Sequence, residues 1–282
     1  MPSFAIVGGG RAGWSFHRAL TTSGWVGDEP HGRHDDLNGL AERSDIIILA
    51  VPDDRIAEVA TTITPGQASV LHLSGVKTLE VLLPHERRGS VHPLMSLPDP
   101  ETGAQRLRAG TVFAVAGDPS ATDVVEALGG HVVAIDEDLR PLYHATAAIA
   151  ANHLVALCGQ VERLASEVGV PVAAYWELMA TTLDNVARAG PAASLTGPAA
   201  RGDESTLAKH LEALPAREHE LYLALAREAS RLAGRPPGPA ITPSPAVHDQ
   251  RRRGPEGTAH EHDPDGVTPH DGGAERHSPG GT

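Results

Sequence analysis

The predicted fold is decided by one short stretch, Val7-Gly8-Gly9-Gly10-Arg11-Ala12-Gly13. It follows an apolar run, Phe4–Val7, and leads into an amphipathic segment, Ala12–Thr22. A glycine-rich turn therefore joins a predicted strand to a predicted helix. This context makes such a turn informative about the fold.

Three glycines of this stretch, Gly8, Gly10 and Gly13, occupy the fixed places of the pattern G-x-G-x-x-G. The first glycine permits a tight turn, the second lets the backbone approach a pyrophosphate, and the third lets the helix pack close to the strand. Arg11 and Ala12 would contribute to the same site at the helix start, where free N–H groups bind anions. The stretch therefore predicts a dinucleotide-binding turn.

The first half of the chain, residues 1–136, alternates short apolar runs with helical segments. Asp45–Val51 is apolar on both faces, as parallel strands covered by helices on each side must be. The predicted strands are Phe4–Val7, Ile46–Val51, Ser69–Leu73, Thr111–Val115 and His131–Ile135. This alternation predicts an α/β domain with a Rossmann-type parallel sheet.

The second strand region of this sheet is shortened. Gly24-Trp25-Val26 is followed at once by a polar, turn-rich segment, residues 27–36, which leaves too little chain for a full strand, helix and strand. Asp28 has nearly the spacing of an acid that binds the adenosine ribose, whereas Arg11 and Arg33 would suit a 2′-phosphate. These residues leave NADP and NAD both open.

The second half of the chain is predicted to be all-helical over residues 137–234. Its helices are expected at Leu139–Val168, Val172–Ala189, Ser205–Leu214 and Pro215–Ala233. Residues 235–282 hold nine prolines and eight glycines but no aromatic residue. Such a segment cannot bury enough apolar surface to offset its ordering entropy, so a disordered C-terminal tail is expected.

Charge and composition narrow the class of partner. Acidic residues outnumber basic ones, 36 to 23, which argues against nucleic acid because phosphate contacts need clustered cations. The single cysteine excludes an internal disulfide, and no run reaches the roughly 18 apolar residues of a membrane span. The irregularly spaced histidines of the tail give no metal site. We expect a cytoplasmic protein with a small-molecule substrate.

Several motifs in order resemble a known family over roughly residues 3–230. They are the glycine-rich stretch, Ala50-Val51-Pro52-Asp53-Asp54, His72-Leu73-Ser74-Gly75, His92-Pro93-Leu94-Met95-Ser96, Gly110–Asp118, Tyr143-His144-Ala145 and Leu195–Asp203. Together they look like bacterial Rossmann-like proteins with a C-terminal helical domain of unknown function. That family is similar in architecture to 6-phosphogluconate dehydrogenase, pyrroline-carboxylate reductase and prephenate dehydrogenase, and some relatives reduce ketopantoate with NADPH.

The resemblance implies a nicotinamide site between the domains and a homodimer formed through the helical domain. Cofactor contacts are then expected from Val51, Pro52 and Asp53, and from Ser74 and Gly75. These residues follow apolar runs at the carboxyl ends of strands, where ligands bind in open α/β sheets.

The catalytic candidates lie on the long helix. His144 and Asn152 are eight residues apart and so lie on nearly the same face. The related dehydrogenases use a Lys-x-x-x-Asn pair on this helix, but here the lysine position is Ala148. His144 is therefore the expected proton donor, with Tyr143 and His92 as alternatives, and Asn152 would orient the reacting groups.

Three residues are expected to contact the substrate. His92 would do so from the sheet, while Arg201, in a turn-rich connector, would bind a carboxylate with both guanidinium nitrogens. Asn185, one turn from Thr182, would line the same pocket.

These residues predict an NAD(P)-dependent oxidoreductase that transfers hydride to a carbonyl or imine of a small acidic metabolite, with a ketopantoate-reductase-like reaction as the most specific version. The alternative is a non-catalytic dinucleotide-binding protein or a degenerate Rossmann scaffold. Methyl transfer from S-adenosylmethionine fits the helical second domain poorly.

Overall fold

The computed structural model describes residues 1–242. The chain divides into two compact units, Met1–Tyr175 and a second unit that begins at Trp176. The expected boundaries at residues 136 and 234 stay predictions.

The first unit is built on a seven-stranded sheet with the order β2-β1-β3-β4-β5-β6-β7. Its strands are β1 (Ser3–Val7), β2 (Val26–Gly27), β3 (Ile46–Leu49), β4 (Ser69–His72), β5 (Arg88–Pro93), β6 (Val112–Gly117) and β7 (His131–Ala134). The Rossmann-type α/β fold is confirmed. All neighbours are parallel except β5 and β6, because the chain segment with α4 (Pro100–Leu107) re-enters the sheet at the end where β5 finishes.

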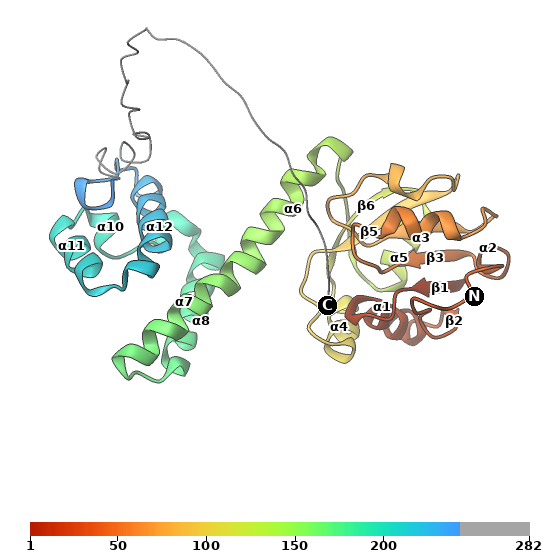
Figure 1. Cartoon of the computed structure of the whole chain (residues 1–282), viewed down its shortest axis with the longest axis horizontal. Helices are drawn as coiled ribbons and strands as arrows, with labels where there is room; N and C mark the ends of the chain where they lie inside the picture. The colour runs from red at the N-terminus through yellow and green to blue at the C-terminus, as the bar shows by residue number, and fades with distance from the viewer. Residues whose placement is uncertain (243–282) are drawn as a thin grey trace, which may run out of the picture. The chain divides into compact units, whose positions relative to one another are not determined.

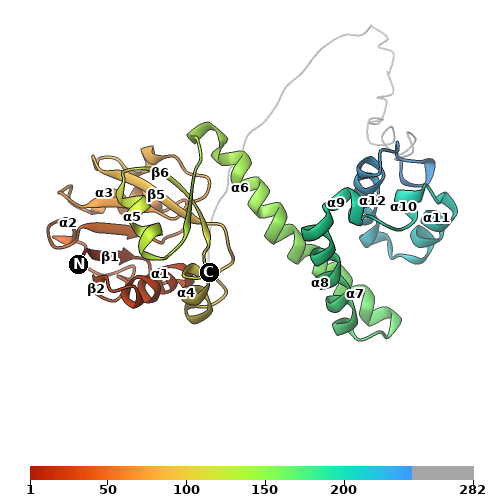
Figure 2. The ribbon, with the colours of Figure 1, turned by 180° about the vertical axis from the view of Figure 1, so that it is seen from behind.

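Side chains alternate between the two faces of the sheet along each strand, so each face packs into its own hydrophobic core. Phe4 and Ile6 of β1 pack toward α1 (Arg11–Thr22), α4 and α5 (Ser120–Ala127), whereas Ala5 and Val7 face the other way. The second face is covered by α2 (Leu40–Arg43), α3 (Ile56–Thr62) and the 3-10 helix η1 (Leu79–Leu82). Figure 1 has α3 in front of the sheet, and the view from behind has α5 in front (Figure 2).

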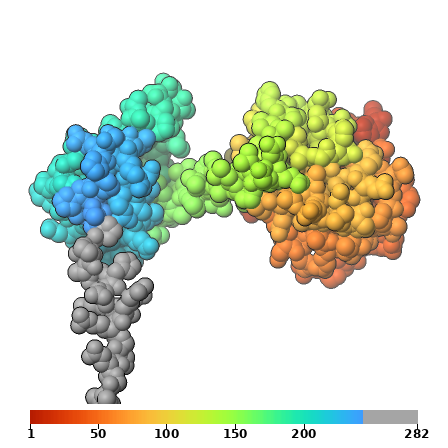
Figure 3. Space-filling view, turned by 90° about the horizontal axis from the view of Figure 1, so that it is seen from above, coloured from red at the N-terminus to blue at the C-terminus, as the bar shows by residue number. Residues whose placement is uncertain are grey.

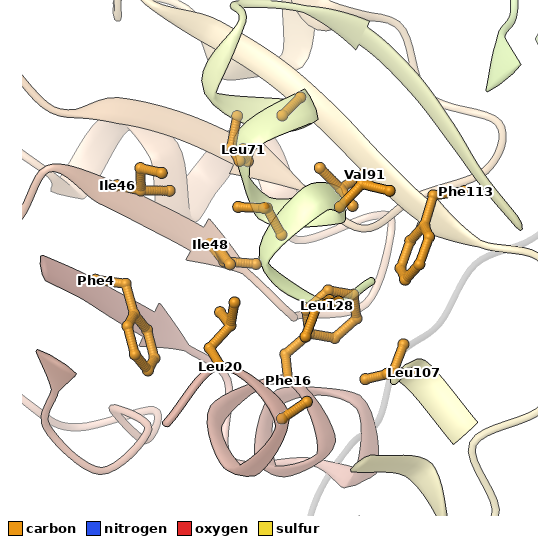
Figure 4. Packing of buried hydrophobic residues seen from close by; sticks show 14 of the residues in the cluster. Phe4, Phe16, Leu20, Ile46, Ile48, Leu71, Val91, Leu107, Phe113 and Leu128 are labelled. Atoms are coloured by element: carbon orange, nitrogen blue, oxygen red, sulfur yellow. The ribbon is translucent and has the colours of Figure 1, made fainter. Parts of the chain in front are cut away.

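The larger core joins α1 to the middle strands. Phe16 and Phe113 meet edge to face with ring centroids 6.4 Å apart, and Leu20, Ile48 and Val91 complete the contact (Figure 4). All five are buried, so this packing fixes the start of α1, and with it the glycine-rich turn, at the carboxyl end of β1.

The second strand is as short as predicted. β2 pairs with β1 through two residues only, and a separate bridge then joins His31 to Val7. The His31 N–H donates to the Ile6 carbonyl and the Gly8 N–H donates to the His31 carbonyl, both at 2.8 Å. Pairing therefore resumes beyond the gap, and it carries the following loop to the glycine-rich turn.

The long helix that was predicted from residue 139 is present in three parts. α6 (Arg140–Ala148) continues through a π-helical turn, η3 (Ile149–His153), into α7 (Leu154–Val168), which ends at Gly169 in the left-handed conformation. In the space-filling view the yellow-green chain with β7 and the start of α6 lies at the surface of the first unit (Figure 3), and every residue of the edge strand β7 is exposed.

The second unit is helical. α8 (Val172–Ala189) enters it and is followed by α9 (Pro191–Ser194), α10 (Pro198–Arg201), α11 (Glu204–Ala213), the 3-10 helix η4 (Ala216–Glu218), α12 (His219–Leu232) and the 3-10 helix η5 (Pro239–Ile241). No helix of residues 1–242 has the length and apolar character needed to cross a membrane.

Residues 235–242 pack against this helical unit. Ile241 is 1% exposed and packs with Leu207 and Ala226. Arg227 donates to the Ile241 carbonyl at 3.0 Å, so the segment is anchored by apolar burial and by its backbone. The rest of the expected disordered tail lies outside the described residues.

Candidate functional site

The order of the strands opens a crevice beside the glycine-rich turn. From β1 the chain passes to β2 on one side, and β3 then pairs on the other side of β1. The carboxyl ends of β1 and β3 therefore lie at a topological switch point, where open α/β sheets bind ligands. A cavity of about 540 Å³ lies here, and we call it the glycine-loop cavity. It is lined by Val7–Gly10, by residues of the 31–38 loop, and by residues of the 50–62 segment.

The three glycines differ in what they permit. Gly8 has φ +124°, and a Cβ there would collide with the Ala50 carbonyl oxygen. A Cβ on Gly13 would collide with the carbonyl oxygen of Gly8, so Gly13 lets α1 approach the turn. A Cβ on Gly10 would meet nothing within 4 Å, and Gly10 lines the cavity. The fold requires two of these glycines, and the third faces open space.

The start of α1 presents backbone donors to this space. Gly10 caps the helix in an extended conformation without a side-chain hydrogen bond, and the first turn holds no acidic residue. The first N–H groups of a helix have no partner within it, and the helix dipole favours an anion there. This end of α1 is therefore suited to a diphosphate.

The loop after the bridge residue His31 forms the far wall of the cavity. Arg33 lines it, while the carboxylate of Asp35 accepts from the Gly32 N–H at 2.7 Å. Arg55 also lines the cavity but is paired with Glu58 at 2.8 Å.

Two of the residues considered for the ribose or its phosphate lie elsewhere. Asp28 is not among the residues that line this cavity. Arg11 donates to the Pro98 carbonyl at 3.5 Å and does not line it either. Of the two arginines considered for a 2′-phosphate, Arg33 is the one at the cavity.

The turns after β3 and β4 are joined to each other. The Ser74 hydroxyl donates to Asp53 at 2.8 Å and accepts from the Lys77 N–H at 3.1 Å. Gly75 lies directly against two imidazoles, because a Cβ there would come within 2.6 Å of His144 and 2.9 Å of His92. This row of turns continues from the glycine-loop cavity toward those imidazoles.

A second cavity, of about 440 Å³, lies beyond Gly75, and we call it the histidine cavity. His144 and Asn152 both line it, together with His92, so the structure brings these predicted residues together. Asn152 lies within η3, whose π turn adds a residue to the helix after His144, and such turns are common where helices carry functional groups. The lining residues are His92, Pro93, Leu94, Met95, Tyr143, His144, Thr146, Ala147, Ala148, Ala150, Ala151 and Asn152.

The side chains at the mouth of the histidine cavity interact closely. His92 Nδ1 lies 2.7 Å from the Tyr143 hydroxyl, and the rings of His92 and His144 are 5.9 Å apart at 74°. Burial, and then the charges of His144 and Arg140, lower the pKa of His92 to about 4, although Asp53 opposes this. Burial raises the pKa of Tyr143. His92 is therefore neutral at pH 7, and both groups stay uncharged there.

The other predicted residues fall in different places. Ala12 and Gly13 are in the first turns of α1, beneath the cavity rather than in its lining. Arg201 ends α10 and Asn185 is exposed on α8, and both belong to the second unit. Residues 1–242 hold no cluster of three histidine, cysteine or acidic side chains placed to bind a metal ion.

The sequence analysis missed one residue of this region. Arg140, at the start of α6, is 1% exposed and donates to the Ser74 carbonyl and the Ser90 hydroxyl. A lone arginine before a proline resembles an exposed helix start, and no sequence signal places it inside. β5 was also missed as a strand, because Arg88-Gly89-Ser90 begins it with polar and small residues.

Comparison with known proteins agrees with this architecture. Residues 111–229 match a family model described as a domain of unknown function, DUF2520. No curated protein sequence matches the chain. The family match therefore covers residues 111–229, while the Rossmann-like fold of the chain is shared with solved structures.

Solved structures share the fold at low sequence identity. BF3122 from Bacteroides fragilis, a presumed NADP oxidoreductase, has a TM-score of 0.68 and 19% identity. Protein TM1727 from Thermotoga maritima has a TM-score of 0.62 and 23% identity, and a pyrroline carboxylate reductase from Plasmodium falciparum with NADP bound has 0.54 and 11%. Each comparison covers 82% of this chain and 98% of the other.

Proposed function

We propose that the protein binds a nicotinamide dinucleotide in the glycine-loop cavity and uses it to transfer hydride to a carbonyl or imine of a small metabolite. The observation that carries this proposal is the open backbone at Gly10, which lies at the start of α1 and at the switch point of the sheet. A diphosphate there would receive the first amides of α1. The dinucleotide would extend past Ser74 and Gly75 to the histidine cavity.

NADP is the proposed cofactor. Arg33 lines the cavity on the loop that follows the β2 region, where dinucleotide-binding domains select the ribose or its 2′-phosphate. The nearby Asp35 is bonded to the loop's own backbone, so it is less free to accept the 2′-hydroxyl of NAD. A guanidinium suits a phosphate group, which makes the phosphorylated cofactor the better match.

The proposed chemistry divides between the cofactor and the chain. When bound, the nicotinamide supplies the hydride. His144 is the proposed proton donor, because it lines the histidine cavity while His92 is neutral and bonded to Tyr143. Asn152 lines the same cavity and is proposed to orient the carbonyl.

The substrate is proposed to be a small acidic metabolite, with a ketopantoate-like 2-oxo acid as the most specific version. No lysine or arginine lines the histidine cavity in the described chain. The carboxylate ligand is therefore proposed to be Arg201, with Asn185 as a further contact, and these two roles depend on the family resemblance.

We also propose a cytoplasmic homodimer formed by the helical part of the chain. Its support is apolar surface, since Ile149, Val155 and Val168 are 59%, 70% and 65% exposed on the long helix. Exposed apolar side chains of this kind can be covered by a partner subunit. Sedimentation equilibrium of the full chain tests this, and a monomer at micromolar concentration would contradict it.

The function is tested in two steps. Calorimetric titration with NADPH and with NADH measures cofactor binding, and oxidation of NADPH is then followed at 340 nm against 2-oxo acids and their neutral ketone analogues. Binding with turnover supports the oxidoreductase. Binding without turnover favours a dinucleotide sensor. The alanine at the lysine position of related enzymes also favours that alternative. If neither cofactor binds, the remaining interpretation is a degenerate Rossmann scaffold.

A further inference from the structure

Arg140 is a buried cation whose hydrogen bonds within residues 1–242 go to a hydroxyl and a carbonyl rather than to a carboxylate. It is the first residue of α6 and is 1% exposed. Burial lowers its pKa, and the charge of Glu137 opposes this. The Nε of Arg140 has no hydrogen-bond acceptor within the described chain. Burying a guanidinium without a bonded carboxylate costs several kcal/mol, so such a group is retained where its charge or its geometry is needed.

The contacts of Arg140 tie the start of α6 to two strand ends. One terminal nitrogen donates to the Ser74 carbonyl at 2.7 Å, and the other donates to the Ser90 hydroxyl at 3.0 Å. Ser74 is in the turn after β4, and Ser90 is on β5, two residues before His92. Because a guanidinium is a rigid fork, it fixes both distances at once, which a single ammonium group does not do.

The charge of Arg140 acts on two histidines of the sheet. His72 is fully buried at the end of β4, and burial followed by Arg140 lowers its pKa to about 4. Burial, then His144 and then Arg140 lower the pKa of His92 to about 4. The titratable and charged groups that face His92 are Asp53 after β3, His72 on β4, and Arg140, Tyr143 and His144 on α6. One carboxylate therefore opposes several cationic or basic groups.

We propose that Arg140 is a positioning residue of this site. Its guanidinium fixes the start of α6 on β5 and on the turn after β4, and so positions Tyr143 against His92, which leaves His144 as the imidazole that serves the substrate. This inference rests on the proposed oxidoreductase function. It goes beyond that function by assigning a role to a residue that lies outside the lining of both cavities.

Histidine titration by NMR tests the charge. The full chain is labelled with 15N-histidine, and His92→Gln assigns the signal of His92. In Arg140→Met the pKa of His92 should rise by roughly one unit, because a positive charge that acts on His92 has been removed. Arg140→Lys retains the charge and should keep the pKa of His92 within about half a unit of the parent. Arg108→Met, which removes an exposed cation at the end of α4, is the matched control and should change nothing.

Hydrogen exchange tests the geometry separately. Arg140→Lys loses the fork, so the amides of the first turns of α6, including Tyr143 and His144, should exchange about tenfold faster while those of α7 are unchanged. If the pKa of His92 is the same in folded Arg140→Met as in the parent, the electrostatic role is wrong. Should Arg140→Met fail to fold, unchanged exchange in Arg140→Lys overturns the proposal by itself.

These readouts need no substrate and no cofactor, so they remain valid if the proposed function fails. Absence of NADPH binding to the parent protein would contradict the proposed oxidoreductase function. The His92 titration would still test the proposed role of Arg140. Normal NADPH binding by the parent, together with an unchanged pKa of His92 in Arg140→Met, would contradict only the proposed role of Arg140.

Discussion

The glycine-loop cavity and the histidine cavity both lie at the carboxyl edge of one sheet, but they are built in opposite ways. The first is made by backbone, since Gly8 and Gly13 allow close packing and Gly10 leaves the amides of α1 open. The second is made by side chains from β5 and α6, which are about fifty residues apart in the sequence. A local sequence pattern therefore specifies the glycine-loop cavity, whereas the histidine cavity depends on the whole fold.

The largest difference between an effect on turnover and an effect on cofactor binding is expected from His144→Gln. If His144 donates the proton, kcat should fall by about 10²- to 10⁴-fold with whichever carbonyl substrate is turned over, because that is the usual contribution of a general acid. The Kd for NADPH should stay within about twofold, since the glycine-loop cavity is untouched. Stopped-flow turnover and calorimetry measure the two quantities. A similar loss in both would show that the two regions are not separable in this way.

The converse experiment is Gly10→Val. A Cβ at Gly10 would meet no protein atom within 4 Å, so the fold should tolerate a side chain there, but that side chain would occupy the space above the amides of α1. Affinity for NADPH should fall at least about 100-fold, which is ~2.7 kcal/mol. Gly13→Val is the contrasting control, because its collision with the Gly8 carbonyl should destabilise the whole unit. If Gly10→Val binds as tightly as the parent, the assignment of the loop is wrong.

Lowering the pH should destabilise the protein through a buried histidine of the sheet rather than through the glycine-rich turn. His72 has a pKa of about 4 in the folded protein, below the usual unfolded value of about 6.5. Between these values the unfolded chain binds more protons, so the free energy of unfolding falls as the pH drops from 6.5 toward 4. The loss should be roughly 1–3 kcal/mol from His72. Urea denaturation of the parent and of His72→Gln measures it, and equal pH slopes in the two proteins would contradict the buried, neutral histidine.

The smallest expected effect concerns the wall of the glycine-loop cavity. Arg33→Ser should weaken NADPH binding by about tenfold while leaving NADH within about twofold, because only the 2′-phosphate needs the guanidinium. Competition titration with the two cofactors measures the ratio. Arg11→Ser is the matched control, since Arg11 contacts the Pro98 carbonyl and does not line the cavity. Equal losses for NADPH and NADH would assign Arg33 to another part of the dinucleotide.

The sequence predicted the parts of the fold that depend on local patterns. The strand, turn and helix around Gly8–Gly13, the shortened second strand and the long helix from residue 139 are all present. A period of apolar residues and the conformational freedom of glycine are local properties, so one sequence is enough to find them.

Other features depend on contacts between distant segments. The antiparallel direction of β6 against β5 follows from how the chain returns to the sheet, and the placing of Ile241 follows from a core that only the folded second unit provides. Arg140 looks like an exposed helix start in the sequence and is buried in the structure. For the candidate site, proximity of His92 and His144 could be expected from strand order, but the bond from His92 to Tyr143 required the register of α6.

The π-helical turn η3 changes how this chain should be aligned with dehydrogenases whose helix is regular. A π turn holds one residue more than an α turn, as if a single residue had been inserted. Counting back one turn from Asn152 through η3 therefore reaches Ala147, whereas an unbroken helix would give Ala148. Both positions carry only a methyl group, and both line the histidine cavity. Neither position offers the lysine that the family resemblance implies.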